Sequence, residues 1–346
     1  MVFHCQIFKI NQKRPERNLI EKAAKIIKKG GLVAFPTETV YGLGANAFNK
    51  KAIRKIFKVK RRPMDNPIII HIADFIDLKK MAKRVPREAK ILAKKFWPGP
   101  LTLVIFKKKI VPDEVTAGAK TVAIRMPKNK IALELIEKSR VPIAAPSANL
   151  AGRPSPTTAQ HVFEDLGDKI DLILDGGKTK IGVESTVLDL TVNPPLILRP
   201  GGLNLENLKQ VLKDIRFHSF LKSGELKNKI SKSTGMKYSH YAPKAPLILV
   251  NGKGKTKKIQ RLINFYKKNK KRVGVMATKE NKKFYKKADL VLTVGSRKNL
   301  KQVAKNLFET LREFDKKMVD VILAEGFEIK GIGFAIMHRL KKATKK

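Results

Sequence analysis

The sequence contains very little cysteine and no long apolar segment. Cys5 is the only cysteine among 346 residues, so an intramolecular disulfide is excluded, and there is no CxxC pair or HExxH stretch to bind zinc. The N-terminus lacks the apolar segment of a signal peptide, and no run approaches the roughly 18 apolar residues that cross a bilayer. We therefore expect a cytoplasmic protein that associates with no membrane and holds no metal of its own.

Acidic residues are also scarce. The chain has 29 Asp and Glu against 75 Lys and Arg, which gives a formal net charge of +46. A charge of this size predicts attraction to polyanions such as nucleotides or RNA. A general enrichment of lysine on solvated helix faces would give the same number, so the charge alone does not name a function.

The residue sets of covalent hydrolases are missing as well. No Ser-His-Asp or Cys-His set stands out, and no pair of carboxylates has an evident partner. The segment NGKGKT (251–256) resembles a phosphate-binding loop, but Leu249 stands where that loop needs its first glycine. We interpret this segment as a solvated turn before a helix.

The apolar pattern predicts two α/β domains joined by a polar linker. In the first part, helical patterns separate many of the short apolar runs LVAFPT, NPIIIHI, LTLVIF, TVAIRM, VPIAAP, DLILD and STVLDL, which predicts a twisted mixed sheet. In the last part, strands such as PLILV and RVGVMA alternate with helices, which predicts a smaller, open parallel sheet. We expect the first domain over residues 1–218, the linker over 219–246 and the second domain over 247–346.

Four polar clusters follow predicted strands or helices of the first domain. They are FPTETVYGLGANA (35–47), KVKRRPMDNP (58–67), VPIAAPSANLAGRPSPT (141–157) and LDGGKTKIGVESTVLDL (174–190). Each has a purely structural alternative, namely a tight turn, a charged helix end, an Ω-loop or a hairpin-like connection. Pro63 and Pro67 weaken that alternative for the cationic cluster, because a stiff backbone preorganises its cations for phosphate. Lys60 and Arg62 of this cluster, together with Arg199 of the later segment ILRPGG, could stabilise charge on phosphates. These cations favour phosphoryl or nucleotidyl transfer.

Four motifs occur together and in order, as in the YrdC/Sua5 family. They are FPTETVYGLG, the Lys-x-Arg-Pro of residues 60–63, the Ser-x-Asn of residues 147–149 and GVEST. The chain resembles Sua5-type members over nearly its whole length. The resemblance implies a YrdC-like domain, a linker that contains GMKYSHYAP (235–243), and a smaller Rossmann-like domain that ends in GIGFAIMHR.

The resemblance also implies a reaction. A Sua5-type enzyme is a nucleotidyltransferase that makes threonylcarbamoyl-AMP from L-threonine, bicarbonate or CO2, and ATP with Mg²⁺, and releases pyrophosphate. Its product passes to a separate tRNA-modifying threonylcarbamoyl transferase complex, which forms threonylcarbamoyladenosine at A37 of tRNAs that read ANN codons. The chemistry of the residues agrees, because cations and Mg²⁺ assist the departure of pyrophosphate. The basic surface would suit a contact with tRNA.

The matched motifs carry site residues. Lys60, Arg62, Ser147 and Asn149 match the catalytic group around the ATP phosphates and the reacting carboxylate. The residues that match the threonine site are Thr39, His71, Arg125 and Ser185, with Arg125 placed to pair with the amino-acid carboxylate. The residues that match the ATP site are Arg62, Asn66, Thr121, Ser147, Ser155, Arg199 and Tyr238. We also expect the linker to fold over the site as a lid, with Tyr238 at the nucleotide.

Two other functions are weighed against this one. A non-catalytic RNA-binding protein would fit the +46 charge and the double-stranded RNA binding of some YrdC-like domains. A carbamoyltransferase like the YrdC-like segment of hydrogenase maturation factors would need zinc-finger and acylphosphatase-like segments, which this sequence lacks.

Overall fold

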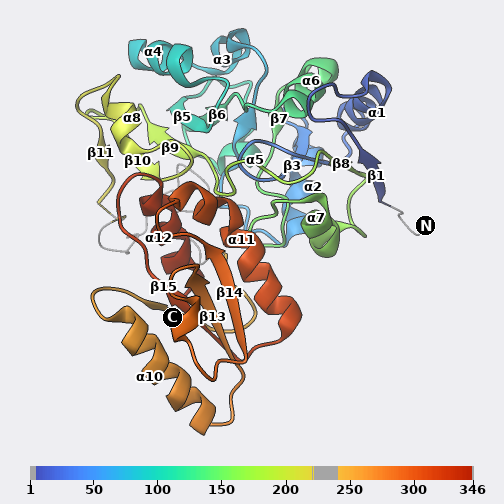
Figure 1. The fold of residues 1–346 in the computed structure, drawn as a ribbon. Helices are drawn as coiled ribbons and strands as arrows, with labels where there is room; N and C mark the ends of the chain where they lie inside the picture. Colours follow the sequence, from blue (N-terminus) through green and yellow to red (C-terminus); the bar gives the residue numbers. More distant parts are fainter. Residues whose placement is uncertain (1–4, 220, 222–240, 345–346) are drawn as a thin grey trace. The chain divides into compact units, whose positions relative to one another are not determined.

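The structure of the protein is a computed structural model that describes residues 5–219, 221 and 241–344. These residues form two compact units, each built on its own β-sheet (Figure 1). The large unit holds most of the chain up to residue 221, and the small unit holds residues 241–344 together with the short segments 152–154 and 181–183. The predicted class, a mixed-sheet α/β domain with a second, smaller parallel sheet, is confirmed.

The large unit contains an 11-stranded mixed sheet with the order β1-β8-β2-β3-β7-β4-β6-β5-β9-β10-β11. The sheet contains both parallel pairs, such as β5 with β9, and antiparallel pairs, such as β5 with β6. The strands are β1 (Gln6–Lys9), β2 (Val33–Phe35), β3 (Gly42–Asn46), β4 (Ile70–His71), β5 (Leu101–Phe106), β6 (Thr121–Arg125), β7 (Ile143–Ala144), β8 (Leu172–Asp175), β9 (Thr186–Asp189), β10 (Leu196–Arg199) and β11 (Arg216–Phe217).

Helices cover both faces of this sheet. Val33 and Phe35 of β2 belong to one apolar core and Ala34 to another, because successive side chains of a strand point to opposite faces. The first core also takes in buried residues of α1 and α6, which lie side by side in Figure 1. The helices are α1 (Arg17–Lys28), α2 (Lys50–Lys60), α3 (Phe75–Met81), α4 (Arg87–Phe96), α5 (Asp113–Thr116), α6 (Lys130–Ser139), α7 (Ala159–Leu166) and α8 (Leu205–Lys209).

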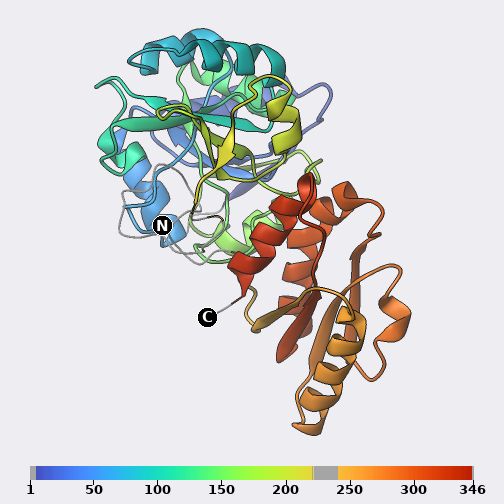
Figure 2. The same ribbon diagram turned by 90° about the vertical axis from the view of Figure 1, so that its left-hand side faces the viewer.

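The small unit has a four-stranded, fully parallel sheet with the order β12-β15-β13-β14. Its strands are β12 (Leu247–Val250), β13 (Val273–Thr278), β14 (Leu290–Gly295) and β15 (Val321–Glu325), and its helices are α10 (Lys255–Lys268), η1 (Lys282–Phe284), α11 (Leu300–Lys317) and α12 (Ile332–Ala343). Val273 and Val275 pack with α10, whereas a Cβ atom on Gly274 would lie 2.7 Å from Phe314 of α11. The sheet is therefore covered by helices on both faces (Figure 2). The segment 251–254 forms a turn directly before α10, as predicted.

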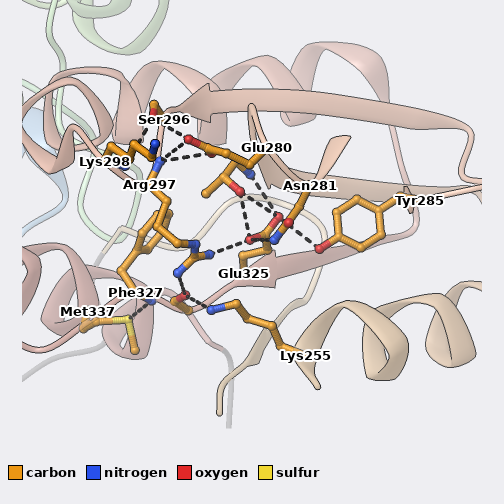
Figure 3. A network of polar contacts seen from close by, with 12 residues as sticks. Lys255, Glu280, Asn281, Tyr285, Ser296, Arg297, Lys298, Glu325, Phe327 and Met337 are labelled. Carbon is orange, nitrogen blue, oxygen red and sulfur yellow. Dashed lines mark hydrogen bonds and ion pairs between the residues drawn. The ribbon is translucent and has the colours of Figure 1, made fainter. Parts of the chain in front are cut away.

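A buried polar network joins the carboxyl ends of three strands in the small unit (Figure 3). The carboxylate of Glu325, at the end of β15, is fully buried and accepts hydrogen bonds from Asn281 (2.8 Å), Tyr285 (3.0 Å) and Arg297 (2.6 Å). Burial and the nearby Glu325 charge raise the pKa of Tyr285. The network was not predicted from the sequence, and its satisfied hydrogen bonds are typical of a structural role.

No helix within the described residues is long and apolar enough to cross a bilayer.

Candidate active site

The cationic segment at the end of α2 lies against the Ser-x-Asn segment. Lys60 is 1% exposed, and its ammonium group donates hydrogen bonds to the backbone carbonyl oxygens of Ser147 (2.5 Å) and Asn149. The hydroxyl of Ser147 donates to the amide oxygen of Asn149 at 2.5 Å. Arg61 has a φ of 49°, and this left-handed conformation ends the helix. Three of the four residues matched to the catalytic group therefore lie together.

Arg62, the fourth residue of that group, is held by its own loop. Its guanidinium donates hydrogen bonds to the carbonyl oxygens of Asn66 and Pro67, both at 3.1 Å. The segment between Pro63 and Pro67 is thus a closed turn, which agrees with the stiffness predicted from the two prolines. The turn places a half-buried guanidinium next to Asn66, which is 1% exposed.

The FPTETVYGLG segment runs beside the Ser-x-Asn segment. The amide of Leu43 donates to the carbonyl of Pro146 at 2.9 Å, so the two segments are joined through their backbones. Gly44 permits this close approach, because a Cβ atom there would lie 2.7 Å from Phe35 and 2.8 Å from Ile143. The packing of Phe35 and Ile143 against this backbone therefore leaves no room for a side chain at residue 44.

Arg125, at the end of β6, is the centre of a second polar group. Its guanidinium donates to the hydroxyl of Thr39 (3.0 Å) and the carbonyl of Gly99 (3.3 Å), and it forms an ion pair with the carboxylate of Glu38 at 2.8 Å. Both charged side chains are about 4% exposed. A guanidinium is a suitable receptor for a carboxylate, because its planar fork of N–H donors can bind both carboxylate oxygens.

Glu38 was not predicted as a site residue. Its position beside Thr39 in the first motif was a signal, but the sequence does not show that it meets Arg125. A small cavity of about 140 Å³ lies next to Glu38, and its other lining residues include Thr37 and Thr179. The ion pair therefore stands at the boundary of a space that can admit small molecules.

His71 lies beside Arg125, because the two residues are partners in the parallel pairing of β4 and β6. Its ring makes an edge-to-face contact with Phe35, and it is 4% exposed. Burial and then the charge of Arg125 lower the pKa of His71 to about 3. The imidazole is therefore neutral near pH 7, and Nδ1 has no hydrogen-bond partner within the described residues.

Ser185 and Arg199 form a third polar group. The hydroxyl of Ser185 lies 2.8 Å from that of Thr102, and the guanidinium of Arg199 donates to the Ser185 hydroxyl at 3.1 Å and to its carbonyl at 3.0 Å. The hydroxyl of Ser155 donates to the carboxylate of Glu184 at 2.6 Å, and Glu184 directly precedes Ser185 in the sequence. The segment 99–102 links this group to Arg125, since residue 99 accepts a hydrogen bond from Arg125 and residue 102 contacts Ser185.

Several buried polar atoms in these groups lack a hydrogen-bond partner among the described residues. They are both side-chain polar atoms of Asn66, Nδ1 of His71, the hydroxyl of Thr121, Nη2 of Arg125 and both carboxylate oxygens of Glu38. The Arg125 and Glu38 atoms still form the ion pair at 2.8 Å, although it lacks hydrogen-bond geometry. A buried polar group without a partner costs about 1–3 kcal/mol. Hydrogen bonds from a ligand can satisfy such atoms; Thr121 lies at the opposite end of β6 from Arg125 and His71.

Tyr238 and most of the GMKYSHYAP segment lie outside the described residues, so the lid stays a prediction. Within residues 5–219, 221 and 241–344 there is no group of three or more His, Cys, Asp or Glu side chains placed to hold a metal ion.

Two family models together match almost the whole chain. The Sua5/YciO/YrdC model, described as "Telomere recombination", matches residues 25–201, and the model "Threonylcarbamoyl-AMP synthase, C-terminal domain" matches residues 203–344. The threonylcarbamoyl-AMP synthase of Pyrococcus abyssi is 52% identical over 96% of both chains, and that of Bacillus subtilis is 49% identical over 94% of this chain and 92% of the relative.

Solved structures of Sua5 and YciO proteins are also similar to this chain. The crystal structure of P. abyssi Sua5 complexed with L-threonine superimposes with a TM-score of 0.93 at 51% identity, and it covers 98% of this chain and 97% of its own. Escherichia coli YciO matches 57% of this chain and 96% of its own with a TM-score of 0.53 at 28% identity. The first of these similarities spans both units.

Proposed function

The chain belongs to the YrdC/Sua5 family of nucleotidyltransferase-type enzymes, and we propose that it makes threonylcarbamoyl-AMP and pyrophosphate from L-threonine, bicarbonate or CO2, and ATP. The relatives that span the whole chain are named for this product, and the similar P. abyssi structure holds L-threonine. The observation that supports the proposal most directly is the set of buried polar atoms without hydrogen-bond partners at Asn66, His71 and Thr121. All three residues were matched to the threonine or ATP site on sequence grounds.

The Arg125 group is the proposed threonine site. The guanidinium of Arg125 would bind the threonine carboxylate, and Thr39, His71 and Ser185 would contact the rest of the substrate. A neutral His71 suits this role, because it offers a hydrogen bond without adding a second positive charge beside Arg125. The ammonium group of threonine loses a proton to solvent, and the free amine attacks the carbon atom of CO2 or bicarbonate. With CO2 a second proton is released as the carbamate forms, and with bicarbonate water leaves instead.

The Lys60 group is the proposed site for the ATP phosphates. A carbamate oxygen attacks the α-phosphorus, and the bond to the bridging oxygen of the β-phosphate breaks, so that pyrophosphate leaves. Lys60 and Arg62 would stabilise the charge that develops on the phosphates, and Mg²⁺ bound to ATP would neutralise the leaving group. Ser147 and Asn149 would orient the reacting groups, while Asn66, Thr121, Ser155, Arg199 and Tyr238 would line the nucleotide.

The product is a mixed anhydride and must be used by another enzyme. We propose that a tRNA-modifying threonylcarbamoyl transferase complex takes the threonylcarbamoyl group and forms threonylcarbamoyladenosine at A37 of tRNAs that read ANN codons. Both reactions would take place in the cytoplasm. The net charge of +46 on this chain would favour contact with tRNA.

Pyrophosphate release with each substrate omitted in turn tests the proposal. We expect release only when L-threonine, bicarbonate and ATP with Mg²⁺ are all present. Release that is independent of threonine would contradict the proposed reaction. RNA binding in a protein that releases no pyrophosphate under any condition would favour the non-catalytic alternative.

A further inference from the structure

A basic hollow of about 770 Å³ opens in the large unit beside the ends of β5 and β6, which are labelled in Figure 1. None of its lining residues belongs to the candidate active site. They are Lys83, Arg84, Phe106, Lys107, Lys108, Lys109, Asp113 and Lys120. The hollow therefore needs an explanation separate from the proposed reaction.

Backbone hydrogen bonds hold the floor of the hollow in place. Three separate segments meet there: the amide of Lys83 donates to the carbonyl of Phe106 at 2.8 Å, and the amide of Lys107 donates to the carbonyl of Lys120 at 3.1 Å. An isolated antiparallel bridge also pairs Ala82 with Lys107. The cations thus come from three segments with fixed backbones, which lowers the entropy lost when they bind a ligand.

The charge of the hollow is almost entirely positive. Six of its eight lining residues are Lys or Arg, and its one carboxylate, Asp113, already pairs with Lys107 at 2.5 Å. The side chains of Lys83, Arg84 and Lys109 form no hydrogen bond or ion pair within the part of the chain that the structure describes, and they are exposed. A ligand for this hollow must therefore be an anion with several charges.

Phe106 narrows the class of ligand. Its side chain is 48% exposed among these cations, at the end of a strand whose other residues are buried. An exposed aromatic ring within a basic groove is the arrangement by which proteins bind single-stranded nucleic acid, because a base stacks on the ring while cations contact the phosphates. A duplex has no free base face to offer the ring, and an acidic peptide would use the cations alone.

We propose that this hollow binds single-stranded nucleic acid, with a base stacked on Phe106 and phosphates paired with Lys83, Arg84, Lys109 and Lys120. Its volume of about 770 Å³ lies within the range of about 300–1,000 Å³ that is common for ligand pockets. The proposal does not depend on the proposed reaction. A protein that makes no adenylate could still bind RNA here, and an active enzyme could fail to do so.

The test uses the full chain and a short fluorescein-labelled oligouridine, with fluorescence anisotropy measured over a series of salt concentrations. The variant K83Q/R84Q/K109Q should bind more weakly, and its slope of log Kd against log salt should be smaller by about 2, because each lost contact with a single strand removes about 0.7. Phe106→Ala should weaken binding by about 5- to 150-fold with little change in the salt slope.

Matched controls lie on α10. K257Q/K258Q/K268Q removes the same charge from exposed lysines of that helix, and Phe265→Ala removes a ring that is 58% exposed. Thermal unfolding of every variant excludes misfolding as the cause of a loss. Equal losses in the α10 controls would overturn the proposal, as would unchanged binding in Phe106→Ala. Equally tight binding of a matched RNA duplex or of poly-glutamate, with the same dependence on Phe106, would also overturn it.

Discussion

Replacing Arg125 by alanine should separate the substrate-binding role of this residue from its structural role. Arg125 and Glu38 are both about 4% exposed and form an ion pair at 2.8 Å. Loss of the guanidinium leaves the Glu38 carboxylate buried without its counter-charge, which costs about 3–5 kcal/mol. The hydrogen bonds to Thr39 and to the carbonyl of Gly99 are lost as well. We therefore expect Arg125→Ala to be clearly less stable in urea unfolding.

The double variant Arg125→Ala/Glu38→Gln is the control for that loss. It removes the unpaired charge, so much of the stability should return, since a neutral amide is far less costly to bury than a carboxylate. The KM for threonine should stay raised in both variants, whereas the KM for ATP should change little. If the double variant recovered the KM for threonine together with its stability, Arg125 would be a structural residue only. Parallel increases in both KM values would place Arg125 at the nucleotide instead.

Three further predictions concern other parts of the chain. Because the pKa of His71 is lowered to about 3, the unfolded chain binds a proton below about pH 6.5 that the folded chain does not, and the free energy of unfolding falls by up to about 1.4 kcal/mol per pH unit as the pH decreases. In urea unfolding, His71→Gln should flatten this decline between about pH 6.5 and 5. An unchanged slope would contradict a buried neutral imidazole. Glu325→Ala should destabilise the small unit by about 2–3 kcal/mol in urea unfolding, because Asn281 and Tyr285 lose their hydrogen-bond acceptor. Arg297 adds little to this cost, since its side chain is 32% exposed and can form hydrogen bonds with water instead. An effect below about 0.5 kcal/mol would show that the network is dispensable. Tyr238→Ala should lower the yield of adenylate per pyrophosphate released if the linker acts as a lid, and equal yields would leave it a connector.

The architecture was predicted well wherever apolar periodicity carries the information. The helix at Arg17–Lys28 buries Ile20, Ala23, Ala24 and Ile27, which recur every three or four residues as on one face of a helix. The apolar runs LTLVIF and TVAIRM form the buried strands β5 and β6. Strand β3 was missed, because its sequence GLGAN has a low strand propensity. It pairs with β2 and β7 through its backbone, and its glycines are what permit that approach.

The motifs named candidate site residues but not the contacts among them. The motifs led to Lys60, Ser147 and Asn149, and the structure brings these three together. The ion pair of Arg125 with Glu38 was not foreseen, because the partners lie in distant segments that only the folded sheet brings together. The Glu325 network was missed for the same reason. Polar pairing over long sequence distances leaves no local pattern, whereas helices and strands do.

The most direct test of the proposed reaction follows the carbon atom of bicarbonate. The full-length protein would be incubated with L-threonine, ATP, Mg²⁺ and either ordinary or ¹³C-labelled bicarbonate, and the products analysed at once by mass spectrometry. The account predicts an adenylate with the mass of threonylcarbamoyl-AMP that gains one mass unit with the label and disappears in the Lys60→Ala variant. An adenylate that carries threonine but no label, or no adenylate at all beside intact substrates, would contradict it.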